Sequence, residues 1–193
     1  NHSSGKMGIA IADEFARQGA VVTLILGPVW IKPQNREVNV LNVTSAEEMY
    51  ETCKANIAEC DAAVLASAVA DYTPANPVGQ KMKSGDRTLQ IELKATRDIA
   101  AEMGKEKSPG QVFVGFALET NDALENAKKK LKKKKLDLII LNSLEDEGAG
   151  FGTDTNKITM IDMSGRINKF ELKPKQEVAK DIVEETLKLL KHA

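Results

Sequence analysis

One nearly unbroken apolar run constrains the fold of this chain more than any other stretch. Residues 62–70 read AAVLASAVA, and all of them except Ser67 are apolar. A strand of a parallel sheet that is covered on both faces has this composition. Asp71 follows at once, and then comes a loop with two prolines, a glycine and the run Lys81-Met82-Lys83-Ser84. Open α/β sheets bind ligands at the carboxyl ends of their strands, so we expect Asp71 at a site and Lys81 on a flap loop above it.

A carboxylate after one strand is also typical of plain surface residues, so the site hypothesis depends on the rest of the chain. Further strands are expected at residues 21–26, 37–43, 111–117 and 136–141, with a ribbon or edge strand at 88–93 and a hairpin at 158–163 and 166–172. Helical patterns lie between them at residues 9–18, after Thr44 or Ser45, from Thr96 or Asp98 to about 105, at 122–135 and at 174–192. This alternation predicts one α/β domain over residues 1–193, with a doubly wound, mainly parallel, Rossmann-like sheet and a C-terminal hairpin.

The first residues, NHSSGKMG, form a glycine-rich turn that enters a helix. Gly5 and Gly8 remove side chains where a backbone or phosphate has to approach, and the N–H groups of the first turn favour an anion. A plain helix capped by Ser3 or Ser4 has the same pattern, so the motif alone leaves both interpretations open. A Walker A loop is excluded, because Lys6 lacks the glycine spacing and the following Ser or Thr. Since such a turn normally follows a strand, we expect a further N-terminal segment that supplies the first central strand.

A run of seven lysines lies between residues 128 and 135, on the helix that Ala127 and Leu131 turn towards the sheet. Most of these lysines are expected on a solvated face. Lys130 and Lys134 are one helical turn apart on a neighbouring face. Two cations in this arrangement, near the ends of strands, are also suited to a triphosphate.

Composition excludes several classes of function. The net charge of −1 gives no general argument for nucleic acid or an anionic membrane, and no apolar run reaches the length of a membrane span. Cys53 and Cys60 have no metal-ligand partners nearby and are expected to be reduced thiols in a cytoplasmic protein. His2 and His192 lie at opposite ends of the chain, which argues against a histidine triad or a zinc site.

Four segments together resemble the bacterial phosphopantothenate–cysteine ligase family, the phosphopantothenoylcysteine synthetases of coenzyme A biosynthesis. They are the NHSSGKMG turn, Ala68-Val69-Ala70-Asp71-Tyr72, Lys81-Met82-Lys83 and Gly115-Phe116-Ala117-Leu118-Glu119-Thr120, and the resemblance covers nearly the whole chain in order. It implies that 4′-phosphopantothenate attacks CTP to give an acyl-cytidylate, which cysteine then converts to an amide, with Mg²⁺ accompanying the triphosphate. Spacing alone fits CTP and ATP equally. The family is typically homodimeric and is often fused to a flavin-dependent decarboxylase domain.

The resemblance also implies roles for individual residues. Asn1, Lys81 and Asp71 match catalytic positions, and phosphopantothenate is held at positions matching Asn1, Ser67, Ala68 and Asp71. Nucleotide-binding positions match Ser3, Gly5, Gly8, Ser67, Asp98, Ile99, Phe116, Lys130, Lys134 and Asn142; no metal ligand is assigned. Two positions depart from the family's pattern: Ser84 stands where the flap motif has a further lysine, and Arg97 stands where a proline often precedes Asp98.

Two other functions compete with the ligase. An NAD(P)-dependent short-chain dehydrogenase has a similar N-terminal turn, and Tyr50 and Lys54 have the spacing of its catalytic pair. That pair precedes the 62–70 strand, however, and the second strand ends in Gly27-Pro28 with no acidic residue for a ribose. The other competing function is a non-catalytic nucleotide sensor on the same fold.

Overall fold

The computed structural model describes residues 3–80, 88–119, 122–142 and 153–192. Its helices are α1 (Lys6–Arg17), α2 (Ala46–Asn56), the 3-10 turn η1 (Ile57–Glu59), α3 (Ile99–Glu106), α4 (Ala123–Lys133) and α5 (Lys175–Leu190). Its strands are β1 (Thr23–Leu26), β2 (Asn39–Asn42), β3 (Ala62–Leu65), β4 (Tyr72–Pro74), β5 (Leu93–Ala95), β6 (Val112–Leu118), β7 (Leu138–Asn142), β8 (Thr155–Asn156), β9 (Ile158–Asp162), β10 (Ile167–Lys169) and β11 (Lys173–Pro174).

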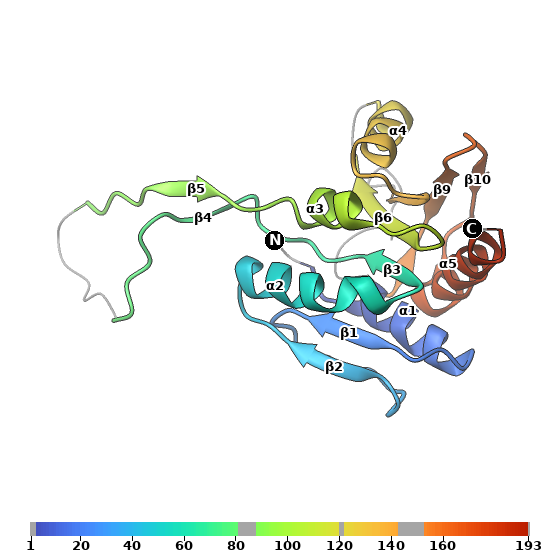
Figure 1. The fold of residues 1–193 in the computed structure, drawn as a ribbon, viewed down its shortest axis with the longest axis horizontal. Coiled ribbons are helices and arrows are strands. Elements are labelled where there is room, and N and C mark those ends of the chain that lie inside the picture. The colour runs from blue at the N-terminus through green and yellow to red at the C-terminus, as the bar shows by residue number, and fades with distance from the viewer. Residues whose placement is uncertain (1–2, 81–87, 120–121, 143–152, 193) are drawn as a thin grey trace.

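The central sheet has the strand order β10-β9-β7-β6-β3 (Figure 1). β3, β6 and β7 run parallel, whereas β9 is antiparallel to β7 and forms the predicted hairpin with β10. The smaller pairs are β1 with β2, which are parallel, and β4 with β5 and β8 with β11, which are antiparallel. The mainly parallel α/β architecture expected from the sequence is therefore confirmed.

Successive side chains of each strand point to opposite faces of the sheet, so both faces carry apolar side chains. Helices pack against both faces. Val112 and Val114 of β6 share a buried cluster with Ile11 of α1 and Ile182 of α5. Phe113, between them, belongs to a second cluster that includes residues of α2, α3 and α4: Met49, Met103 and Leu131. The two clusters are the two layers of a doubly wound fold, as the strand–helix alternation predicts.

The strand predicted over residues 62–70 is shorter than expected. Only Ala62–Leu65 pair with β6, and all four residues are half-buried rather than fully covered. β3 is the last strand of the described central sheet, so only one of its edges has a hydrogen-bonded partner there. The further N-terminal strand expected from the sequence stays a prediction.

Residues 71–80 and 88–97, here called the arm, leave the body of the molecule between β3 and α3 (Figure 1). Its base is the short β4–β5 ribbon, where the N–H of Thr96 donates to the carbonyl of Asp71 and that of Ala75 to Glu92. The strand predicted at 88–93 is wrong in position, since β5 begins only at Leu93. The alternation of Leu89, Ile91 and Leu93 is real, but these side chains are exposed and no described sheet covers them. The predicted flap falls mostly on residues 81–87, outside the described part.

Most helix ends follow the expected chemistry. Ser45 caps α2 by accepting from the N–H of Glu48, and Asp98 caps α3 by accepting from that of Ala101. Gly19 takes the positive φ expected of a residue that ends α1. The serine cap predicted for α1 is wrong: Gly5 is the N-cap residue, and no side chain caps the helix.

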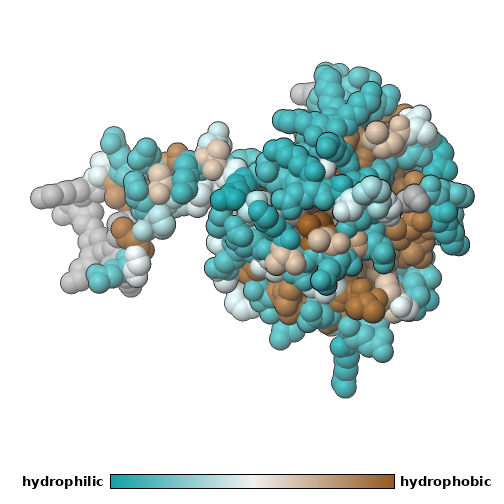
Figure 2. All heavy atoms as spheres, viewed as in Figure 1, coloured by the Kyte–Doolittle hydropathy of each residue, from teal (hydrophilic) through white to brown (hydrophobic). Residues whose placement is uncertain are grey.

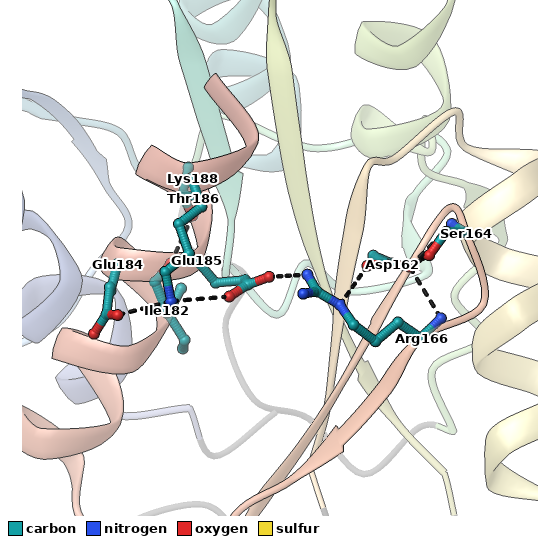
Figure 3. Close-up of polar contacts among 8 residues, drawn as sticks. All are labelled: Asp162, Ser164, Arg166, Ile182, Glu184, Glu185, Thr186 and Lys188. Atoms are coloured by element: carbon teal, nitrogen blue, oxygen red, sulfur yellow. Dashed lines mark hydrogen bonds and ion pairs between the residues drawn. The ribbon is translucent and has the colours of Figure 1, made fainter. Parts of the chain in front are cut away.

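A network of ion pairs joins the β9–β10 hairpin to α5 (Figure 3). Arg166 Nε lies 2.9 Å from Asp162 Oδ2, and its guanidinium also contacts Glu185. Asp162 accepts further hydrogen bonds from the Ser164 hydroxyl and from the N–H groups of Ser164 and Arg166. Burial alone would raise the pKa of Asp162, but these donors hold its pKa below the usual value.

Among the described residues, no helix combines the length and the apolar character that crossing a membrane requires.

Candidate functional site

The candidate site lies at the carboxyl edge of the parallel strands. β3 ends at Leu65 opposite Gly115, and β6 and β7 end together at Leu118 and Asn142. Ser67, Ala68 and Asp71 lie in the segment that follows β3, whereas the other described site residues lie on β6, on β7 and on or just before the neighbouring helices. Parallel strands end at a common edge, so the sequence order brings these segments together.

The N-terminus of α1 meets this edge. The backbone of Gly5 has a φ angle of +75°, which residues with a side chain rarely adopt. A Cβ at this position would lie 3.2 Å from the side chain of Val29. A Cβ on Gly8 would lie 3.8 Å from Ala66, just past the end of β3. Gly8 thus lets the first turn of α1 lie close to the chain that leaves β3, and Gly5 lies against the chain that follows β1. The N-cap residue Gly5 has no side chain to cap the helix, and the N–H groups of a helix start favour an anion.

Lys6, the first residue of α1, forms an ion pair with Asp154 at 2.5 Å. Asp154 lies just before β8, and the ammonium of the buried Lys175 donates to carbonyl oxygens on either side of it, at Thr153 and Thr155. Desolvation, followed by the nearby charge of Lys6, lowers the pKa of Lys175. This arrangement ties the start of α1 to the start of α5 beside the candidate site.

Lys130 and Lys134 both point away from their own helix towards acidic residues of other elements. Lys130 Nζ lies 2.5 Å from Glu119, directly after β6, and Lys134 Nζ lies 2.9 Å from Asp98, the N-cap of α3. Although partial burial by itself would raise the pKa of Asp98, the hydrogen bonds from Lys134 and from the N–H of Ala101 hold its pKa below the usual value. By contrast, Lys128 contacts only Glu125 of its own helix, at 3.7 Å. The two lysines singled out in the sequence are therefore distinguished by structure as well.

Gly104 lets α3 approach the end of α4. A Cβ at this position would lie 2.0 Å from the carbonyl oxygen of Lys134, and Gly104 is fully packed inside the molecule. The close contact brings the helix capped by Asp98 up to the turn that carries Lys134. This close approach of the two helices cannot be predicted from the sequence, because an isolated glycine in a helix gives no indication of what it packs against.

Phe116 and Asn142 lie on the strands themselves. Phe116 packs against the cluster on the α1 and α5 face, whereas Lys130 and Lys134 belong to α4 on the opposite face. A ligand that contacts all three residues has to pass over the edge of the sheet. Asn142 accepts a hydrogen bond of 3.0 Å from the side chain of Asn156.

The segment after β3 is more open. Ser67 and Asp71 are exposed, and Ala68 is half-buried. Ser67 and Ala68 were predicted within the strand but lie past the end of β3, and Asp71 begins the arm. Ile99 begins α3 and is buried under it, so its backbone rather than its side chain is available to a ligand. Asn1 and Lys81 lie outside the described residues.

The geometry disfavours the dehydrogenase. Tyr50 is buried in the core, and the guanidinium of Arg97 lies 4.4 Å from its ring centre, so Tyr50 and Lys54 do not form a catalytic pair at the strand ends. Both cysteines are free thiols in the described structure, and burial raises the pKa of Cys53 to about 11. Within the described ranges, no group of three or more His, Cys, Asp and Glu side chains is arranged to hold a metal ion.

Three contributors to the site were missed by sequence reasoning: Glu119, Asp154 and Gly104. Glu119 was part of a segment that carries the family resemblance, but its charge partner Lys130 lies on the next helix rather than at a spacing within one element. Asp154 and Lys6 are 148 residues apart. Neither pair follows a spacing rule, because the contacts depend on how helices dock against strands.

Comparison with known proteins gives a consistent result. Residues 1–190 match the family model described as the DNA/pantothenate metabolism flavoprotein C-terminal domain. The chain is 40% identical over 191 residues to the coenzyme A biosynthesis bifunctional protein CoaBC of Bacillus subtilis (strain 168), covering 99% of this chain and 47% of that protein. It is 55% identical over 190 residues to a protein of an unknown prokaryotic organism named cysteine/cysteine sulfinic acid decarboxylase, covering 98% of this chain and 53% of that protein.

Solved structures share the fold. The crystal structure of the C-terminal domain of CoaBC superposes with a TM-score of 0.81 at 36% identity, covering 99% of this chain and 87% of that one. A Cab2 mutant in complex with phosphopantothenate-cysteine has a TM-score of 0.76 at 14% identity, which shows a common fold alone. The chain spans about half the length of the curated relatives it matches, 47% and 53% in the two cases above.

Proposed function

Because the chain belongs to the family described as the DNA/pantothenate metabolism flavoprotein C-terminal domain, we propose that it condenses 4′-phosphopantothenate with cysteine in coenzyme A biosynthesis. The family resemblance inferred from the sequence is confirmed by this match and by the CoaBC relatives. The ligase activity, the use of CTP and the residue roles are proposals that rest on the candidate site.

The proposed reaction has two steps. A carboxylate oxygen of phosphopantothenate attacks the α-phosphorus of CTP, and the bond to the β-phosphate oxygen breaks, releasing pyrophosphate. The amine of cysteine then attacks the carbonyl carbon of the acyl-cytidylate; the amide forms, a proton is lost and CMP leaves. The first step brings negative charges together, so the protein has to supply positive charge and donors.

The observation that carries this proposal is the placement of Lys130 and Lys134. Their ammonium groups are held at the ends of β6 and α3 by Glu119 and Asp98. The N–H groups at the start of α1 lie on the other side of the same edge. A triphosphate that crosses the edge would meet the lysines on one side, and an anionic group would meet the helix N-terminus on the other.

Mg²⁺ enters this scheme with the nucleotide. Magnesium usually retains several waters and binds one or two carboxylates together with substrate phosphates, rather than a cage made only of protein groups. We assign no protein ligand to the ion and derive no step from it.

The decarboxylase name of the 55% identical relative concerns a protein of which this chain covers 53%. The CoaBC relatives are named bifunctional, and the chain covers 47% of the Bacillus subtilis protein. We propose that the natural gene product carries a second, flavin-dependent decarboxylase domain, and that decarboxylation belongs to that domain.

We further propose that the protein is a homodimer and that the arm forms part of its interface. The exposed large hydrophobic residues of the arm are Tyr72, Val78, Leu89, Ile91 and Leu93. In Figure 2 the arm shows brown spheres among hydrophilic ones. A two-stranded ribbon of three residues a strand is marginal by itself in water. A second copy of the chain offers an arm of the same composition, so the two ribbons can bury their apolar faces together.

The function is tested by incubating the complete gene product with CTP, Mg²⁺, phosphopantothenate and cysteine and measuring pyrophosphate and the condensed product. Titration calorimetry with CTP, ATP and NADPH runs alongside. If the protein is the ligase, we expect it to bind CTP and to form pyrophosphate and the condensed product. Binding of NADPH in place of CTP supports the dehydrogenase, and CTP binding without turnover supports the sensor; either result contradicts the proposal.

A further inference from the structure

Glu119 is an acidic residue at a place where the proposed reaction needs positive charge. It lies directly after β6, and its side chain is only 16% exposed. Its Oε1 atom is shielded from solvent and lies 2.5 Å from the ammonium of Lys130. A carboxylate in such a position is stable only when a nearby cation compensates for the lost water. Lys130 is that cation, through an ion pair rather than a hydrogen bond, because Oε1 has no hydrogen-bond partner in the described structure.

The contact differs from the other acidic contact of the lysine run. Glu125 and Lys128 are three residues apart on one helix, are 67% and 40% exposed and lie 3.7 Å from each other. Such a pair restricts neither side chain strongly. Glu119 and Lys130 come from a strand end and a helix, so their contact fixes the lysine head group relative to the edge of the sheet.

We propose that Glu119 is a positioning residue for the nucleotide: its ion pair holds the ammonium of Lys130 at the edge of the sheet, with N–H groups left for the triphosphate. An ammonium group has three donors and no acceptor, so a single carboxylate partner orients it without consuming its capacity. This inference rests on the proposed function of the same site. The inference goes beyond the proposed function, because it gives a buried carboxylate a role in binding a polyanion.

The sign of the effect separates this role from simple charge repulsion. Glu119 is itself negative, so removing it weakens the repulsion that a triphosphate meets. If Lys130 kept its place without help, loss of Glu119 would strengthen CTP binding. If Glu119 positions Lys130, loss of the carboxylate weakens CTP binding despite the more favourable net charge.

The experiment uses the complete gene product with the variants Glu119→Ala, Glu119→Gln, Lys130→Ala and the double variant Glu119→Ala/Lys130→Ala. Glu125→Ala is the matched control. Calorimetry gives the Kd for CTP, and turnover gives KM and kcat. We expect Glu119→Ala to raise Kd and KM for CTP by about tenfold, the size expected for losing a hydrogen bond to a charged group, with a much smaller change in kcat. Glu119→Gln still accepts a hydrogen bond and restores part of the affinity. Glu125→Ala leaves both constants unchanged.

Non-additivity is the decisive readout. In the Lys130→Ala background, Glu119→Ala has no further effect on CTP affinity if Glu119 acts through Lys130. Unchanged or tighter binding by Glu119→Ala, or additive losses in the double variant, overturns the inference. Should Glu119→Ala fail to fold, the same cycle with Glu119→Gln decides in the same way. If the unaltered protein neither binds CTP nor turns over, the proposed function fails instead, so the two failures are distinguishable.

Discussion

At the scale of single residues, the lysine run shows what spacing can and cannot predict. Several lysine pairs in the run are four residues apart, so the i, i+4 rule alone does not single out Lys130 and Lys134; the family resemblance selects them. The structure pairs these two with Glu119 and Asp98. Spacing did not reveal the carboxylates, since they come from other elements, nor that Phe116 packs on the opposite face of the sheet.

Lys130→Ala and Lys134→Ala are each expected to weaken CTP binding about tenfold or more, because each removes a charge-assisted contact with the triphosphate. Lys128→Ala and Lys132→Ala, on other faces of α4, serve as controls with little effect. Calorimetry measures the affinities, and circular dichroism checks that the fold is kept. Equal losses in all four variants would mean a diffuse basic surface and would remove the site.

Gly104→Ala is expected to destabilise the protein by about 1–3 kcal/mol, the usual consequence of overpacking. The added methyl group would meet the backbone oxygen of Lys134 at 2.0 Å, and a backbone atom cannot rotate away. Gly79→Ala is the control, since a Cβ there meets nothing within 4 Å. Urea denaturation measures both. A Gly104→Ala protein with unaltered stability would show that α3 and α4 are not held this closely.

At the scale of elements, sequence periodicity predicted nearly every helix and central strand, because their apolar faces match the two buried layers. It failed where an element lacks such a layer. The run 62–70 is apolar except for Ser67, yet only Ala62–Leu65 pair with another strand. The alternating segment 88–93 forms a ribbon only from Leu93, where β4 lies opposite. The sequence pattern predicts which residues suit a strand, whereas the strand forms only where a second backbone segment lies beside it to accept and donate hydrogen bonds.

The hairpin–α5 network makes stability depend on acid pH. The pKa of Asp162 is lowered in the folded state, so its contribution is present above the unfolded pKa near 3.9 and is lost as pH falls through the folded value. We expect the free energy of unfolding to fall below about pH 4. Asp162→Asn lowers stability at pH 7 by about 1–3 kcal/mol and flattens the dependence below pH 4, because Arg166 loses its charged partner.

Urea denaturation at pH 7, 4 and 3 measures this effect. Glu184→Gln is the control, since Glu184 pairs with Lys188 on the exposed side of α5 and contributes little. A pH profile of Asp162→Asn identical to that of the unaltered protein would show that another carboxylate is responsible.

At the scale of the whole molecule, the arm is the feature that the body of the fold does not explain. Its base lies at the carboxyl edge that carries the candidate site, and from there it projects away from the body (Figure 1). We expect Ile91→Glu combined with Leu93→Glu to convert a dimer to a monomer, because both side chains are more than half exposed and a charge there opposes apolar contact. Light scattering after size exclusion gives the mass. Val21→Glu, a fully exposed position outside the arm, is the control. Unaltered mass of the arm variant, or a monomeric parent protein, contradicts the proposed interface.

The central claim is that the phosphopantothenate carboxylate becomes joined to the α-phosphorus of CTP before the amide forms. The most direct test labels both carboxylate oxygens with heavy oxygen, adds CTP, Mg²⁺ and cysteine, and analyses the nucleotide product by mass spectrometry. We expect CMP that carries one heavy oxygen, because the carboxylate oxygen that attacks the α-phosphorus stays bonded to that phosphorus when the amine attacks the carbonyl carbon. Unlabelled CMP, or heavy oxygen in inorganic phosphate together with CDP, would contradict it.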